Sequence, residues 1–250
     1  RATVAMMGAR SPDETIRAQP SAYASTSLPR LTVERSDPGG PESAPARREV
    51  VRRGPLLGAG GMGEVYAGVQ RSLGRSVALK FVGPKDEASS REARTALLRE
   101  ARITGRLEHP NIVPVHVLGV DQIDVPVMVM KRIEGVSWRA LLRDRDHPQW
   151  RRWDTQYRDS LEAHLSVLLS VCDALEYAHR KGVIHRDIKP DNVMIGPFGE
   201  VYLLDWGIAL EVDAQEPASS IVGTPSFMAP EMVDGAIGAV SERTDVFLLG

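Results

Sequence analysis

The order of apolar and polar residues predicts a β-rich first half of the folded region. Short β-branched or apolar runs alternate with Gly-rich turns, as successive antiparallel strands do. The runs are REVVRRGPLLG, EVYAGVQ, SVALKFV, NIVPVHVLGV and VPVMVMKR. Within residues 88–109 the spacing becomes helical, with Ser89 or Ser90 as the expected cap. One face of this predicted helix carries Ala93, Leu97, Thr104 and Leu107.

After Gly135 the pattern is mostly helical. SWRALLRD predicts a short helix, and RDHPQWRRWDTQYR is a polar connection that carries two tryptophans. A long amphipathic helix follows over SLEAHLSVLLSVCDALEYAHRKG and ends at Gly182, a common stop signal. Two short strands, NVMIG and VYLLD, then flank the turn GPFG. We therefore predict a small β-rich lobe with one helix, a connector, and a larger helical lobe.

The two ends of the chain read differently from its middle. Residues 1–48 are rich in Ser, Pro, Ala and Arg without any structural period, which predicts a disordered leader. The chain does not begin with Met and stops at Gly250 inside an apolar run, so we expect a longer natural protein. As a 250-residue polypeptide it is expected to expose an apolar patch, to be poorly soluble and to have little activity. That patch would begin at Val246, Phe247 and Leu248.

Charge and cysteine content narrow the classes of function. The net charge of −2 provides no basic field for nucleic acid. The single cysteine, Cys172, excludes a disulfide framework within the chain. No apolar run approaches the roughly 18 residues of a membrane helix. We expect a cytoplasmic location, with tethering through sequence beyond Gly250 left open.

Two strand motifs suggest phosphate binding. LGAGGMGEV places Gly58, Gly60 and Gly63 between strands, where glycine lets the backbone approach phosphate oxygens; a Gly-rich hairpin of an ordinary sheet fits equally well. A strand after the glycines, in place of a helix, argues against a dinucleotide fold. Lys80 is the one charged residue of SVALKFV and reads either as an exposed edge lysine or as a phosphate ligand. Glu100 lies on the apolar helical face, so we expect it to pair with Lys80.

Two later motifs suggest phosphoryl chemistry. VIHRDIKPDNVMI brings Asp187, Lys189 and Asn192 together within six residues, which suits orienting a hydroxyl, neutralising a phosphoryl group and holding a metal. VYLLDWGIAL buries Asp205 among apolar residues. An unpaired carboxylate there is costly, so Asp205 lies either at a strand end in water or beside a positive partner.

Together these motifs resemble the protein kinase family, specifically the Hanks-type serine/threonine branch found in bacteria. The resemblance covers residues 49–250 and rests on GAGGMG, VALK, HRDIKPDN, DWG and MAPE in that order. It implies the α+β bilobal kinase fold, with a small lobe over 49–131, a hinge over 131–136 and a partial large lobe over 137–250.

The resemblance assigns catalytic and metal-binding roles by position. Asp187 would be the catalytic base and Lys189 would neutralise the γ-phosphate, while Lys80, held by Glu100, would bind phosphate. Asn192 and Asp205 would hold Mg²⁺. His185 is expected to be structural. Trp206 departs from the Phe of the family's D-F-G motif, from which we expect altered packing but not loss of metal binding.

The resemblance also assigns an ATP pocket. Met130 would be the gatekeeper, the backbones of Lys131 and Ile133 would bond the adenine, and Val65 and Ala78 would form the roof. The full set of predicted nucleotide-binding residues is Leu57, Gly58, Gly60, Gly63, Val65, Ala78, Lys80, Met130, Lys131, Ile133, Asn192 and Asp205.

The resemblance also implies an activation loop between Asp205 and Glu231 and, with it, the roles of Arg186, Thr224 and Asp245. Phosphate on Ser219 or Ser220 would give Arg186 an anionic partner; the alternative is an unmodified serine pair. Thr224 is expected to bridge Asp187 and Lys189. Asp245 is expected to bond the backbone near His185.

The predicted function is transfer of the ATP γ-phosphoryl group to serine and threonine hydroxyls of proteins, with autophosphorylation through self-association. One alternative is a pseudokinase scaffold that binds nucleotide without transfer, favoured by the missing end of the large lobe. Another is a small-molecule phosphotransferase. Lys189 and the segment GTPSFMAPE, which shapes a peptide groove in the family, argue against the latter.

Overall fold

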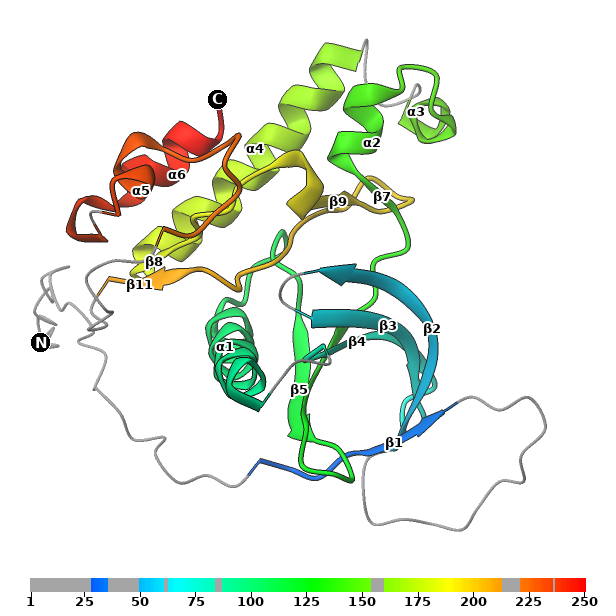
Figure 1. Cartoon of the computed structure of the whole chain (residues 1–250). Coiled ribbons are helices and arrows are strands. Elements are labelled where there is room, and N and C mark those ends of the chain that lie inside the picture. The colour runs from blue at the N-terminus through cyan, green and yellow to red at the C-terminus, as the bar shows by residue number, and fades with distance from the viewer. Residues whose placement is uncertain are drawn as a thin grey trace, which may run out of the picture.

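The computed structural model describes residues 28–35, 50–60, 63–83, 87–153, 160–212, 221–235 and 237–250. They form a small sheet lobe and a larger helical lobe, so the predicted α+β, two-lobed fold is confirmed (Figure 1). The small lobe has one sheet of strand order β1-β2-β3-β4-β6-β5 and one helix. Its elements are β1 (Thr32–Arg35), β2 (Val50–Gly60), β3 (Gly63–Gln70), β4 (Arg75–Phe81), α1 (Glu87–Arg106), β5 (Val115–Val120) and β6 (Pro126–Lys131).

The two faces of β4 meet different parts of the lobe. Val77, Leu79 and Phe81 alternate along the strand and belong to one buried apolar cluster inside the curved sheet. Ala78 and Lys80 lie between them and, by the same alternation, point to the opposite face. Helix α1 packs beside β5 and β6, where Leu97 and Ala101 join Met128 in a second cluster. The apolar face predicted for this helix is confirmed, although the helix begins at Glu87, before the two serines expected to cap it.

Part of the expected leader is ordered, which corrects the prediction for residues 28–35. Residues 29–35, here called the strap, include β1, which pairs in parallel with β2 from Thr32↔Val50 to Arg35↔Arg53. Leu31 is only 2% exposed because its side chain enters the cluster inside the sheet. Val33 packs, partly buried, against the same cluster, and the serine- and proline-rich composition of the leader hid both residues. The rest of the leader, residues 1–27 and 36–48, lies outside the described residues.

The large lobe is built around the long helix predicted after the polar connection. Its buried side chains, among them Val167, Val171 and Leu175, form the centre of the largest apolar cluster. Most expected elements are present, and the polar connection contains a short helix, α3. The elements are β7 (Val136–Ser137), α2 (Trp138–Arg143), α3 (Pro148–Trp153), α4 (Ser160–Arg180), β8 (Val183–Ile184), η1 (Pro190–Asn192), β9 (Val193–Ile195), β10 (Val201–Leu203), β11 (Leu210–Glu211), α5 (Pro230–Val233), η2 (Ile237–Ala239) and α6 (Glu242–Leu248).

Backbone hydrogen bonds join the lobes between α1 and β5. Ile112 forms a parallel bridge with Leu203 of β10. The Leu203 N–H donates to the Asn111 carbonyl at 2.7 Å, and the Asn111 side-chain amide donates to the Val201 carbonyl at 3.0 Å. The segment after α1 is therefore fixed to the large lobe.

The C-terminal helix α6 partly matches the expected apolar patch. Val246 is 62% exposed and Phe247 is 54% exposed, whereas Leu248 is buried in the large-lobe core. The expectation was therefore wrong for Leu248, because the helix turns this residue toward α4 and its neighbours in the cluster. In the part of the chain that the structure describes, no helix combines the length and apolar character needed to cross a membrane.

Candidate active site

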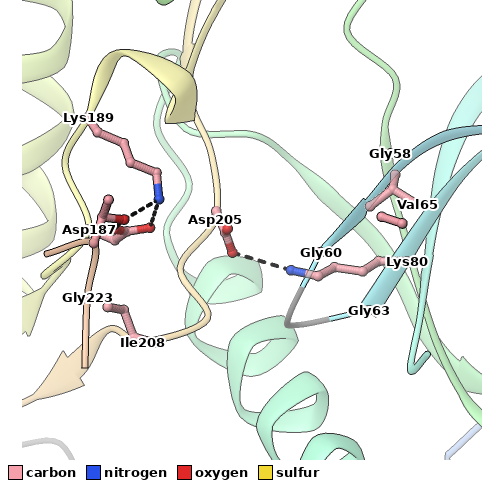
Figure 2. Close-up of a pocket in the computed structure, with 12 residues that line it drawn as sticks. Gly58, Gly60, Gly63, Val65, Lys80, Asp187, Lys189, Asp205, Ile208 and Gly223 are labelled. Carbon is pink, nitrogen blue, oxygen red and sulfur yellow. Dashed lines mark hydrogen bonds and ion pairs between the residues drawn. The ribbon is translucent and has the colours of Figure 1, made fainter. Parts of the chain in front are cut away.

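A cavity of about 410 Å³ lies between the Gly-rich hairpin and the large lobe (Figure 2). Both lobes contribute side chains that the sequence analysis selected. These are Gly58, Gly60, Gly63, Val65, Lys80, Asp187, Lys189, Asp205 and Thr224. Ala59, Ile208 and Gly223 also line the cavity and were missed, because each is a small or apolar residue without a chemical signature.

The hairpin over the cavity depends on glycine at one position. Gly63 has φ +130°, and a Cβ atom there would lie 2.0 Å from the Phe81 carbonyl oxygen. A Cβ atom on Gly58 or Gly60 would meet nothing within 4 Å. Gly63 therefore fixes the turn, while the other two leave open space above the cavity.

Lys80 and Glu100 form the buried ion pair that the helical spacing predicted. The Lys80 ammonium donates to both Glu100 carboxylate oxygens, at 2.6 and 2.8 Å, and both side chains are almost fully buried. It also lies 3.3 Å from the Asp205 carboxylate, the contact drawn in Figure 2. Burial alone would lower the pKa of Lys80, but the two carboxylates outweigh it, so the pKa is raised. The ammonium is thus held charged at the cavity.

For Glu100, burial and the Lys80 charge shift the pKa in opposite directions, and burial has the larger effect. Burial raises the pKa of its carboxyl above the usual value, and the Lys80 ammonium opposes this rise. The short contacts to both carboxylate oxygens are those of an ionised pair. The charge of Glu100 therefore depends on Lys80.

Asp187 is the centre of a second hydrogen-bond network. The Lys189 ammonium donates to Asp187 Oδ2 at 2.7 Å and to Thr224 Oγ1 at 2.6 Å. The Thr224 hydroxyl donates to Asp187 Oδ1 at 2.8 Å. The Asn192 carboxamide donates to the Asp187 backbone carbonyl at 2.8 Å and to Oδ2 at 2.9 Å. These bonds hold the Asp187 carboxylate in one orientation at the cavity wall, with Thr224 as the predicted bridge.

Buried groups behind the cavity fix the loop that carries Asp187. The Asp245 carboxylate accepts from the backbone N–H groups of His185 and Arg186, both at 2.8 Å, as expected. His185 is fully buried; its Nδ1 accepts from the Asp187 N–H at 3.1 Å, so Nε2 carries the proton and donates to the Leu204 carbonyl at 3.0 Å. Arg186, whose N–H bonds Asp245, and Asp205, whose carboxylate contacts Lys80, adopt positive φ angles of 68° and 61°. His185 is thus placed as a structural residue.

Burial of His185 makes stability depend on pH. Burial lowers its pKa from the ordinary value of 6.5, so below that value the unfolded chain binds a proton that the folded chain does not. Stability is then lost as pH falls, and the thermal midpoint should be lower near pH 5.5 than near pH 7.5. His116 and His164 shift in the same direction. Calorimetry of His185→Gln should show a smaller difference between the two pH values; an unchanged difference would contradict this assignment.

Trp206, which follows Asp205 in the chain, has a buried ring. It is 1% exposed and its ring centroid lies 4.5 Å from that of His185. Its Nε1–H has no hydrogen-bond partner among the described residues. A buried donor without an acceptor costs about 1–3 kcal/mol, a cost that the Phe expected at this position would not incur.

Because the Trp206 indole N–H has no partner among the described residues, replacing Trp206 by Phe should destabilise the fold less than replacing the more exposed Trp138. Trp138 is less buried, but its Nε1 donates to His164 Nδ1 at 2.8 Å. We expect Trp206→Phe to change the free energy of unfolding by less than about 1 kcal/mol, because losing apolar contact is offset by removing the unpaired donor. Trp138→Phe, which removes a satisfied bond, should cost more. Urea unfolding of both variants tests the order, and a larger loss for Trp206→Phe would overturn it.

Of the residues predicted to hold adenine, Val65 lines the cavity, whereas the lining does not include Ala78, Met130, Lys131 or Ile133. Ala78 and Met130 are cross-strand partners in β4 and β6. Lys131 turns its ammonium over the Tyr202 ring, 4.5 Å from the centroid, and its backbone N–H donates to the Pro114 carbonyl at 2.9 Å. Leu57 is half-exposed on the hairpin. Their contact with a base stays a prediction.

The predicted regulatory residues are only partly described. Ser219 and Ser220 lie outside the described residues. Arg186 is buried, and its Nε donates to the Ile208 carbonyl at 2.6 Å. Burial, together with the nearby Arg99, lowers its pKa to about 10. An anion beside these two arginines would be favourable. Because neither serine is described, the phosphoserine switch stays a prediction.

Comparison with known proteins addresses the family. A family model described as "Protein kinase domain" matches residues 51–250. The chain is 37% identical over 228 residues to "Serine/threonine-protein kinase PknD" of Chlamydia muridarum, covering 82% of this chain and 24% of that protein. The PknD proteins of Chlamydia abortus and Chlamydia caviae are 37% and 36% identical, over 78% and 82% of this chain and 22% and 23% of theirs. The chain thus spans about a quarter of the length of these relatives. Because the family model covers most of a chain whose two lobes enclose this site, the chain belongs to the protein kinase domain family.

Proposed function

We propose that this chain transfers the γ-phosphoryl group of Mg·ATP to serine and threonine hydroxyls of proteins. One observation carries the proposal: Lys80, Asp187 and Asp205 line one cavity beneath the Gly-rich hairpin. Relatives that bear the name serine/threonine-protein kinase support the same reaction. Transfer to the protein itself through self-association, and a cytoplasmic location, belong to this proposal.

The residues present fit a magnesium nucleotide. Mg²⁺ prefers oxygen ligands and is usually held by one or two protein side chains together with phosphates. The Asp205 carboxylate is about one-third exposed at the cavity, and the Asn192 carboxamide is fixed by Asp187, so Asp205 and Asn192 would hold the ion. When bound, Mg²⁺ would neutralise phosphate charge. Lys80 would bind phosphate oxygens with an ammonium already oriented by Glu100.

Asp187 and Lys189 would serve the acceptor hydroxyl. Asp187 would orient the hydroxyl and accept its proton while the oxygen bonds to the γ-phosphorus and the bond to the β-phosphate oxygen breaks, releasing ADP. Lys189 is within reach of both Asp187 and Thr224 and would balance negative charge there. The Thr224 bridge ties this network to the segment that begins a predicted peptide groove.

The test is incubation of the full-length protein with Mg·ATP, followed by mass spectrometry of the protein and of added peptides. Peptides with serine or threonine as the acceptor should gain one phosphate, and matched peptides with tyrosine should not. Phosphate found only on a small molecule would favour the small-molecule phosphotransferase. Nucleotide binding without any transfer would favour the pseudokinase scaffold.

A further inference from the structure

The strap closes the small-lobe sheet. Without it, β2 and β5 would be the two edges of that sheet. The strap pairs with β2 on one side and forms a parallel bridge from Arg30 to Val120 of β5 on the other. The Leu31 N–H donates to the Val120 carbonyl at 2.8 Å, and the Val120 N–H donates to the Pro29 carbonyl at 3.0 Å. Figure 1 shows β1 crossing from the side of β5 to β2 at the end of the lobe far from the cavity.

Leu31 is the main anchor of the strap. Its 2% exposed side chain joins the cluster of Val77, Leu79 and Phe81. The ion pairs of the strap are weaker anchors: Arg30–Asp124 is about half-exposed or more, and Arg71–Glu34 is partly exposed with its atoms 3.4 Å apart. Such surface pairs contribute little. β5 makes room for the strap at Gly119, where a Cβ atom would lie 2.6 Å from the Pro29 carbonyl oxygen and 2.7 Å from Leu31 Cγ.

Strand β4 connects this anchor to the cavity. Leu79 and Phe81 face Leu31, and Lys80 lies between them on the opposite face, bonded to Glu100 and Asp205. Because interiors are close-packed, a void left by Leu31 lets the strand shift, and the shift is felt on its other face. The alternation of β4 therefore places the contacts of Leu31 and the Lys80 ammonium on opposite faces of one strand.

We propose that the strap is a positioning element for the nucleotide, in which Leu31 acts through β4 on Lys80. The proposal rests on the function proposed above. It assigns a role in Mg·ATP binding to a segment that lies outside the family match at residues 51–250.

The experiment displaces the strap in the full-length protein from two directions. Leu31→Ala removes the anchor, and Gly119→Val expels the strap by occupying its space. Arg30→Ala is the matched control within the strap, and Val167→Ala truncates the core of the large lobe. Initial rates against Mg·ATP concentration give KM and kcat. Hydrogen exchange follows the amides of the strap and of residues 77–81, and all measurements are made well below the unfolding temperature.

We expect Leu31→Ala and Gly119→Val to raise KM for Mg·ATP by roughly three- to tenfold with little change in kcat. Both should speed amide exchange in residues 77–81, Leu31→Met should restore most of the lost affinity, and neither control should move KM. The inference is overturned if the strap amides exchange freely in both variants while KM stays unchanged, or if Val167→Ala raises KM equally. If the unaltered protein binds no Mg·ATP, the proposed function is wrong. The coupling of the strap to β4 is tested separately: unchanged amide exchange in residues 77–81 when the strap is displaced would refute the inference.

Discussion

Asp187→Asn is expected to lower the rate of phosphoryl transfer by about 10³-fold, the effect typical of removing a general base. The carboxamide is nearly the same shape, and its oxygen can still accept from Lys189 and Asn192 at the Oδ2 position. Its NH₂ group would face Thr224, whose hydroxyl can accept as well as donate. The network should survive, whereas the ability to accept a proton should not.

The measurement separates chemistry from binding. Transfer is followed by mass spectrometry, and Mg·ATP affinity by direct titration, which should stay within about twofold of the unaltered protein. Asp173→Asn, an exposed change of the same kind on α4, is the control and should transfer phosphate normally. If Asp187→Asn keeps more than about a tenth of the rate, Asp187 is not the base.

Lys80→Met is expected to damage both stability and activity. It leaves the Glu100 carboxylate, only 4% exposed, without its cation. Removing one partner of a buried pair costs about 3–5 kcal/mol. Activity should fall by about 10²-fold or more, because the ammonium aimed at the cavity is lost.

A double replacement separates the two losses. Lys80→Met combined with Glu100→Leu substitutes apolar groups of similar volume for the buried pair, so the free energy of unfolding should recover most of its loss. Activity should not recover. Denaturant unfolding and initial rates of the unaltered protein, Lys80→Met and the double variant provide the comparison. Restored activity in the double variant would show that Lys80 acts only through stability.

The elements with strong periodicity were predictable from the sequence. Helix α1 and its inward Glu100 followed from spacing alone, because a carboxylate on an apolar face needs a cation. The meeting of Lys80 with Asp187 and Asp205 is different, since more than a hundred positions separate the lysine from either aspartate and only the family resemblance placed them together.

Other features had no signal that sequence reasoning could use. The strap is a short run in a segment rich in serine and proline, and its two inward-packing apolar residues, Leu31 and Val33, are too few to establish a period. β7, β8 and β11 are two residues long, too short for alternation to appear. The unpaired Trp206 N–H depends on what surrounds it, which the sequence does not encode locally.

The hydrogen bonds of Asn111 and the bridge from Ile112 to Leu203 fix the segment just after α1 to the large lobe, so a tilt of the helix would pivot about that end. The fixed end lies just beyond Arg106, and the 20-residue helix is about 30 Å long. Glu100 lies about 9 Å from the moored end, so its displacement is roughly a third of that at Glu87. A displacement at the Glu87 end would therefore move the Glu100 carboxylate, which bonds Lys80, by a smaller amount.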